Sequence, residues 1–298
     1  MLNVLKKWRG RDDEPSSVGY SASMRDLVAD LHYEIVPMKS IDQAIEDLPA
    51  GAHVSVTCSP AKGIAATQEY TEQLIELGHR PVPHFSARLV EGPEHVTRLA
   101  TWLREHNVPE VFVIAGDAAE PAGPYEGALP FIRDLLAADP GVDRLGITGY
   151  PDGHAMIDDA EITRQLHAKQ AVLAEAGVGG WVSTQMCFDE EKIRSWLVTE
   201  RAAGLALPVQ LGVPGVVDRA RLMTMGTRLG IGASMRWVSG SKARRSVTGS
   251  SNCRPSGPKS QNVPGTSSES TGSATRSIVI VVASDSAPGG TVNETLPP

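Results

Sequence analysis

The sequence predicts an α/β protein, a (β/α)8 TIM barrel whose last strand–helix unit is missing or replaced by a low-complexity tail. Short β-rich runs alternate with amphipathic stretches of helical length, which is typical of βα units around a parallel sheet. Seven such units occupy about 240 residues, which suits a (β/α)8 barrel that lacks one unit. A doubly wound sheet is the alternative fold, but no GxGxxG motif follows the first strand.

The expected strands and helices follow one another along the chain. The β-rich runs predict strands at His32–Val36, His53–Cys58, Pro81–Phe85, Val111–Ala115, Arg144–Thr148, Gly180–Met186 and Pro208–Val213. The amphipathic stretches predict helices at Ala65–Leu77, Pro93–His106, Glu126–Ala138, Asp158–Ala176, Glu190–Ala203 and Val217–Leu229. Gly177 and Gly204 follow two of these helices, and glycine favours the left-handed conformation that ends a helix.

The composition changes sharply after Trp237. Of the 61 residues in 238–298, 33 are Ser, Thr, Gly or Pro, so most of this stretch cannot bury enough apolar surface to order. The exception is the β-branched run Ser277–Asp285, which could pair as a strand. We expect an N-terminal extension at 1–30, a barrel domain at 31–237 and a disordered tail at 238–298. We further expect that the tail does not close the barrel.

Composition and charge exclude several classes of protein. Only 5% of the 298 residues are aromatic and the net charge is −7, which argues against a nucleic-acid partner. No apolar run approaches the length that spans a bilayer, and the first residues lack the apolar core of a signal peptide. Three cysteines without a CxxC pair favour reduced thiols. These features predict a cytoplasmic protein with no membrane partner.

Polar residues gather where the predicted strands end, and the active site of a (β/α)8 barrel is built there. They are Glu34, Thr57, Cys58, His84, Arg88, Asp117, Tyr150, Asp152, His154, Thr184, Gln185 and Asp189. Plainer interpretations stay open: Glu34 as a buried ion-pair partner, Asp117 as a turn residue, and Cys58 as a core residue. No HxxxH or HxH spacing occurs among these residues, so we expect no metal site.

Six of these segments resemble a known family when they are taken together. YEIVPMK, VSVTCSP, PHFSAR, GD, GYPDGH and STQMCFD follow the order and approximate spacing found in methylenetetrahydrofolate reductases. The resemblance covers about residues 33–237. It implies a (β/α)8 barrel that reduces methylenetetrahydrofolate, a small-molecule folate substrate, to methyltetrahydrofolate. The hydride donor in this family is NAD(P)H, and the hydride normally passes through bound FAD.

The resemblance also implies roles for individual residues. Glu34 matches the general acid, which protonates the folate and opens its imidazolidine ring to an iminium. Asp117 matches an aspartate near both pterin and flavin, and Gln185 matches a glutamine that hydrogen-bonds the pterin. The residues that match the flavin-lining positions are Thr57, His84, Tyr150 and His154.

Two departures from the family pattern concern the cofactor. Ala115 stands where family members commonly have an arginine, and Leu173 stands in the place of a lysine. Both missing side chains are cations that contact the flavin or its phosphates. The departures predict weak or absent FAD and direct hydride transfer from NAD(P)H. A non-catalytic folate- or flavin-binding relative and a different barrel enzyme, such as a flavin oxidoreductase or a pterin methyltransferase, remain as alternatives.

Overall fold

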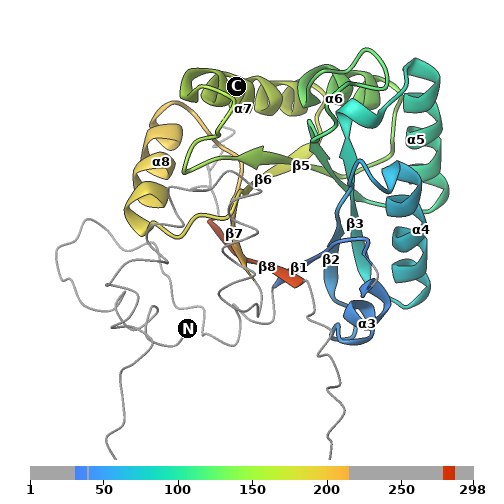
Figure 1. The fold of residues 1–298 in the computed structure, drawn as a ribbon. Coiled ribbons are helices and arrows are strands. Elements are labelled where there is room, and N and C mark those ends of the chain that lie inside the picture. Colours follow the sequence, from blue (N-terminus) through green and yellow to red (C-terminus); the bar gives the residue numbers. More distant parts are fainter. Residues whose placement is uncertain (1–30, 39, 215–277, 286–298) are drawn as a thin grey trace, which may run out of the picture.

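The computed structural model describes residues 31–38, 40–214 and 278–285 (Figure 1). Seven strands lie side by side in chain order, and each is parallel to the next. They are β1 (His32–Ile35), β2 (His53–Val56), β3 (Arg80–Ser86), β4 (Glu110–Ile114), β5 (Arg144–Gly149), β6 (Gly179–Thr184) and β7 (Val209–Pro214). The expectation of an α/β fold with a curled parallel sheet is confirmed.

The helices between the strands cover the outside of this sheet (Figure 1). They are α3 (Ile41–Glu46), α4 (Gly63–Glu76), α5 (Pro93–Glu105), α6 (Ala128–Ala137), α7 (Asp159–Glu175) and α8 (Glu190–Ala202), and a short 3-10 helix covers Ala87–Leu89. The sequence analysis placed no helix at α3, because six residues are too few for a clear amphipathic period. The expected helix Val217–Leu229 lies outside the described residues. No helix in the described ranges is long and apolar enough to cross a membrane.

An eighth strand corrects the expectation that the tail leaves the barrel open. β8 (Ile278–Asp285) pairs antiparallel with both β1 and β7, so the backbone pairing forms a closed ring. The register shifts at Gln210/Leu211, where β7 carries an irregularity. Because β8 is antiparallel, the described residues do not form a complete (β/α)8 barrel. Within the described residues, β8 lies between β7 and β1, where the last strand of such a barrel would lie.

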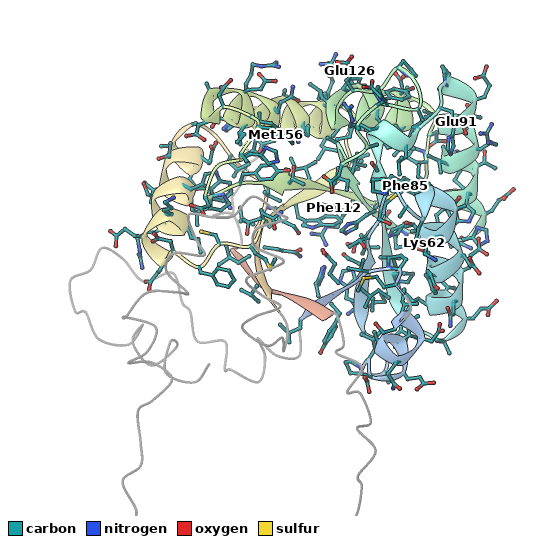
Figure 2. All side chains as sticks on the ribbon, in the orientation of Figure 1. Lys62, Phe85, Glu91, Phe112, Glu126 and Met156 are labelled. Atoms are coloured by element: carbon teal, nitrogen blue, oxygen red, sulfur yellow. The ribbon has the colours of Figure 1, made fainter. Side chains whose placement is uncertain are left out.

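Side chains alternate between the inside of the ring and the layer beneath the helices. Phe112 belongs to an inner cluster with Val82 and Trp181, whereas Phe85 packs outward against Trp102 of α5 (Figure 2). The inner cluster also explains Gly146. A Cβ atom at this position would lie 2.2 Å from Phe112 and 2.4 Å from Trp181, so only glycine fits. The middle of the ring is therefore filled with aromatic side chains.

A charged layer lies at the N-terminal ends of the strands, below this cluster. His53 Nε2 lies 2.6 Å from Glu110 Oε2, and Arg144 Nη1 donates to Glu110 Oε1 at 2.8 Å. His32 contacts His53 with 3.4 Å between ring centroids. Burial by itself would raise the pKa of Glu110, but the hydrogen bond and charge of His53 and the charge of Arg144 lower it overall. These groups occupy the end of the ring opposite to the predicted site.

Candidate functional site

The segments that follow β4 and β5 bring three predicted site residues close together. Tyr150 follows β5, and its ring meets the His154 ring edge-on with centroids 5.3 Å apart. Burial raises the pKa of Tyr150, a hydrogen bond with Thr148 opposes the rise, and the charge of Asp117 adds to it. Asp117 therefore lies within electrostatic reach of the Tyr150 hydroxyl. The structure thus gathers Asp117, Tyr150 and His154 at one sector of the rim.

Glu34 lies on β1, in register with Ser55 of β2. Its carboxyl group has no hydrogen-bonding or ion-pair partner among the described side chains. Burial alone raises its pKa to about 7, because a charged carboxylate loses its hydration inside the protein. The alternative interpretation of Glu34 as one half of a buried ion pair therefore finds no partner in the described part of the chain. A carboxyl group in this state exchanges a proton near neutral pH.

Thr57 and His84 lie at the ends of neighbouring strands. The Thr57 hydroxyl is buried and has no partner among the described groups, although the Thr57 carbonyl accepts a hydrogen bond from Thr67 at 3.2 Å. His84 is buried and packs against Phe112 with ring centroids 4.6 Å apart. Burial lowers the pKa of His84 to about 3, so its imidazole is neutral. An unpaired buried hydroxyl is a site that a bound ligand can satisfy.

Gln185 follows β6, and its main chain and side chain are both fixed. Its backbone N–H donates to the Gly149 carbonyl at 2.8 Å, which extends the pairing of β5 and β6. Its side-chain Oε1 accepts from the Met186 N–H, also at 2.8 Å. The side-chain NH₂ group is left as a donor. No hydrogen bond or ion pair joins Glu34, Asp117 and Gln185 to one another, so the described structure places them around the ring without direct contact.

The sequence analysis did not assign a role to an inner polar relay that crosses from β6 to β7. Trp181 Nε1 donates to Ser183 Oγ at 3.2 Å, and this hydroxyl donates to Gln210 Oε1, also at 3.2 Å. Thr184, named as a rim residue, instead accepts from the Gly212 N–H at 3.0 Å. The alternation of inward and outward side chains along β6 was the signal that could have separated Ser183 from Thr184.

A second missed contact crosses the rim between the β5–α7 loop and α8. Lys192 Nζ in the first turn of α8 forms an ion pair with Asp152, whose side chain is only 4% exposed. A cation is unfavourable near a helix N-terminus, and the Asp152 carboxylate offsets this. Asp189 caps the same helix and accepts from the N–H groups of Glu191 and Lys192. The GYPDGH loop is thereby tied to α8.

The two departures from the family pattern take different positions. Ala115 is exposed directly after β4, at the rim. Leu173 is buried in the core beneath α7, where it packs against Gly180 of β6. One turn earlier on the same buried face lies Lys169, and burial lowers the pKa of its ammonium group to about 8. Neither Ala115 nor Leu173 supplies a cation to the rim.

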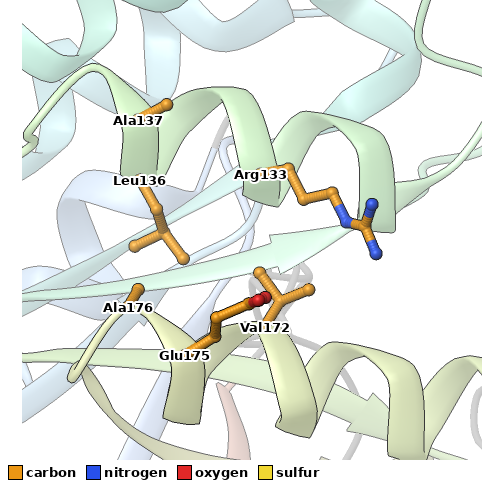
Figure 3. A pocket seen from close by; sticks show the side chains of 6 residues that line it. All are labelled: Arg133, Leu136, Ala137, Val172, Glu175 and Ala176. Carbon is orange, nitrogen blue, oxygen red and sulfur yellow. The ribbon is translucent and has the colours of Figure 1, made fainter.

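A groove on the outside of the protein lies between α6 and α7, away from the rim residues Asp117, Tyr150 and His154 (Figure 3). It is lined by Arg133, Leu136, Ala137, Val172, Glu175 and Ala176. These residues belong to the ends of α6 and α7 that lead into the N-terminal ends of β5 and β6. The groove is therefore separate from the rim. Within the described ranges, no group of three or more His, Cys, Asp or Glu side chains could hold a metal ion.

Comparison with known proteins gives a distant relative by sequence. No protein-family model matches the chain. A segment of 115 residues is 28% identical to methylenetetrahydrofolate reductase 2 from Saccharomyces cerevisiae. The matched segment covers 36% of this chain and 18% of that protein. The chain therefore matches less than a fifth of the length of this relative. The match supports a distant relationship to methylenetetrahydrofolate reductases over part of the chain.

Two solved structures are similar to a lesser degree. Triphenylmethane reductase from Citrobacter sp., complexed with NADP(H), is 10% identical and covers 57% of this chain and 55% of its own, with a TM-score of 0.29. The apo form of AtPrR2 is 14% identical and covers 53% of this chain and 49% of its own, with a TM-score of 0.25. At these TM-scores neither structure supports a conclusion about this chain.

Proposed function

We propose that this chain is an oxidoreductase that reduces 5,10-methylenetetrahydrofolate to 5-methyltetrahydrofolate with hydride from NAD(P)H. The observation that carries the proposal is Glu34, a half-buried carboxyl group that has no ion-pair partner in the described chain and whose loss of hydration raises its pKa to about 7. A general acid works best when its pKa lies near the working pH. The distant relationship to a methylenetetrahydrofolate reductase supports the choice of substrate.

Glu34 performs the first step of the proposed reaction. The protonated carboxyl group donates its proton to the departing nitrogen of the imidazolidine ring, and the C–N bond to that nitrogen breaks. The remaining nitrogen forms an iminium with the methylene carbon. A hydride from C4 of the dihydronicotinamide then adds to this carbon, which becomes the methyl group, and NAD(P)⁺ leaves. Glu34 regains a proton from water before the next turnover.

Asp117 and Gln185 bind the pterin in this proposal. The exposed Asp117 carboxylate can accept hydrogen bonds from the pterin amino and ring N–H groups. The Gln185 side chain offers its NH₂ group as a donor, because its oxygen is already bonded to the Met186 N–H. These two residues therefore present complementary groups, an acceptor from β4 and a donor from β6.

The hydride reaches the folate directly from NAD(P)H rather than through tightly bound FAD. Thr57, His84, Tyr150 and His154 could line a flavin ring, and the unpaired Thr57 hydroxyl fits a ligand at that position. A flavin, when bound, would relay the hydride. However, the diphosphate of FAD needs positive charge, and Ala115 and Leu173 provide none. We therefore expect FAD to bind weakly.

A non-catalytic folate-binding protein is the second candidate. Ala115 and Leu173, which stand in the places of two cations, favour it. A relative that lost its redox step would lose selection for the cations around the flavin. Such a protein would keep folate binding through Asp117 and Gln185. It would not oxidise NAD(P)H.

The test is NAD(P)H oxidation by the purified full chain, measured with and without methylenetetrahydrofolate. Oxidation that depends on the folate, with methyltetrahydrofolate identified by mass spectrometry, supports the proposal. Folate binding without oxidation supports the second candidate. If the protein shows no folate binding and no oxidation, both candidate functions are refuted. Protein purified without added FAD should lack the visible absorbance of a flavin. Stoichiometric flavin or ping-pong kinetics would contradict direct transfer.

A further inference from the structure

We infer that Arg88 is a positioning residue of this site, because it holds the loop that carries Asp117. The inference deepens the proposed function and rests on it for the role of Asp117. Arg88 lies in the 3-10 helix (Ala87–Leu89) that follows β3, whereas Asp117 follows β4. The two residues belong to neighbouring strand ends of the rim.

The Arg88 side chain reaches across to three carbonyl groups of the β4–α6 loop. Its Nε donates to the Ala118 carbonyl at 2.7 Å, and its Nη2 donates to the Ala119 carbonyl at 2.7 Å. Its Nη1 donates to the Glu126 carbonyl at 3.2 Å, near the other end of the loop. The guanidinium thus binds the carbonyl groups of the two residues directly after Asp117 and of Glu126, which lies two residues before α6.

The main chain of Arg88 contacts the same loop on both sides of Asp117. Its N–H donates to the Ala115 carbonyl at 3.0 Å, and its own carbonyl accepts from the Ala122 N–H at 2.8 Å. Gly116 completes the fit. It has a φ of +92°, and a Cβ there would lie 1.7 Å from Ser86 Oγ, so the loop packs tightly against the end of β3.

Asp117 itself makes no hydrogen bond or ion pair to a described residue, so the direction of its carboxylate depends on the backbone around it. Arg88 supplies that backbone with contacts at residues 115, 118 and 119. Lysine would keep the main-chain contact at residue 115 but cannot replace the side-chain contacts at residues 118 and 119, because a single ammonium group lacks the planar fork that reaches separate carbonyl groups. Arg88 therefore acts on the proposed reaction through Asp117 and not by touching the substrate.

The first experiment measures the loop itself and does not depend on the proposed reaction. Arg88→Met should raise the hydrogen-exchange rate of the Ala122 amide and its loop neighbours at least tenfold, because loop opening becomes easier. Arg98→Met is the matched control, since Arg98 is an exposed arginine on α5 that pairs with Glu91. The control should leave this exchange unchanged. Unchanged exchange in Arg88→Met would overturn the inference.

The second experiment measures the coupling between Arg88 and Asp117. In folate-dependent NADH oxidation, Arg88→Met should lower kcat/KM at least tenfold, and Arg88→Lys should recover only part of the loss. The double variant Arg88→Met/Asp117→Asn should be no slower than Asp117→Asn alone, because both changes remove the same contribution. Losses that multiply would show that Arg88 acts independently of Asp117 and would overturn the inference.

The two experiments separate this inference from the proposed function. If the wild-type chain oxidises neither NADH nor NADPH with methylenetetrahydrofolate, the proposed function fails, and the exchange measurement still decides whether Arg88 holds the loop. If Arg88→Met does not fold, Arg88→Lys serves in both experiments. Exchange in Arg88→Lys that matches the wild type would then contradict the inference.

Discussion

At the scale of single residues, the most unusual feature is the half-buried carboxyl group of Glu34, which has no counter-charge among the described side chains. Glu110 at the other end of the ring shows the ordinary solution, in which His53 and Arg144 hold the carboxylate in its charged form. Glu34 has no such neighbours among the described side chains. An uncompensated buried carboxyl group costs stability, and such groups cluster at functional sites.

The substitution Glu34→Gln tests this residue directly. It removes the acidic proton and keeps the shape of the side chain, so turnover should fall by about 10²- to 10⁴-fold while folate binding is retained. Steady-state kinetics and a folate-binding titration measure both quantities. Glu46→Gln on the exposed face of α3 is the control and should behave like the wild type. Unchanged turnover in Glu34→Gln would remove this residue from the mechanism.

The residue motifs predicted where the candidate site residues lie along the strands, but not the contacts between them, and the roles of these residues stay predictions. The strand-end pattern identified Asp117, Tyr150 and His154, and the structure brings them to one sector of the rim. The hydrogen bonds from Arg88 to the β4–α6 loop could not be predicted, because they depend on the path of this loop in three dimensions. The interpretation of Cys58 as a core residue is confirmed, because this side chain is buried in the main hydrophobic cluster.

At the scale of elements, the strands with strong β-branched runs were found within one or two residues of their observed ends. The predicted strand His32–Val36 is observed as His32–Ile35, and Arg144–Thr148 as Arg144–Gly149. Ser277–Asp285 was recognised as a run able to form a strand, but its antiparallel pairing with β1 and β7 was not expected. Pairing between segments so far apart leaves no local signal in the sequence.

The substitution Val281→Pro tests whether β8 closes the ring. Val281 pairs with His32 on one side and Gly212 on the other, and proline removes a backbone donor from a strand that has neighbours on both sides. We expect a lower melting temperature and rapid proteolytic cleavage within residues 278–285. Val281→Ala is the control, because it keeps the backbone N–H. Cleavage rates that are equal in Val281→Pro and Val281→Ala would mean that β8 does not depend on this pairing.

At the scale of the whole molecule, buried titratable groups set how stability depends on pH. Burial, together with the charge of His53, lowers the pKa of His32 to about 3, and burial lowers that of His84 to about 3. The pKa values of His79 and His95 are also lowered, mainly by burial. Between about pH 6.5 and 4.5 the unfolded chain binds protons on these rings that the folded chain excludes, so acidification destabilises the fold.

Glu34 opposes this trend, which allows a quantitative test. Its pKa is raised from 4.5 to about 7, so between these values the folded chain binds a proton that the unfolded chain lacks. Urea unfolding should show that wild-type stability falls between pH 6.5 and 5. In Glu34→Gln the fall should be steeper by up to about 1.4 kcal/mol per pH unit, because the opposing proton is lost. Equal slopes in the two proteins would contradict the raised pKa.

The antiparallel closure has a consequence for the synthesis of this chain. Each of the first six strands pairs with the strand that the ribosome delivers next, so these pairings can form while translation continues. β1 finds its second neighbour only when β8 has emerged, since His32 pairs with Val281 about 250 residues later. Until that moment the open edges of β1 and β7 can pair with other nascent chains. The slowest and most aggregation-sensitive step of biogenesis should therefore come after residue 285 has left the exit tunnel.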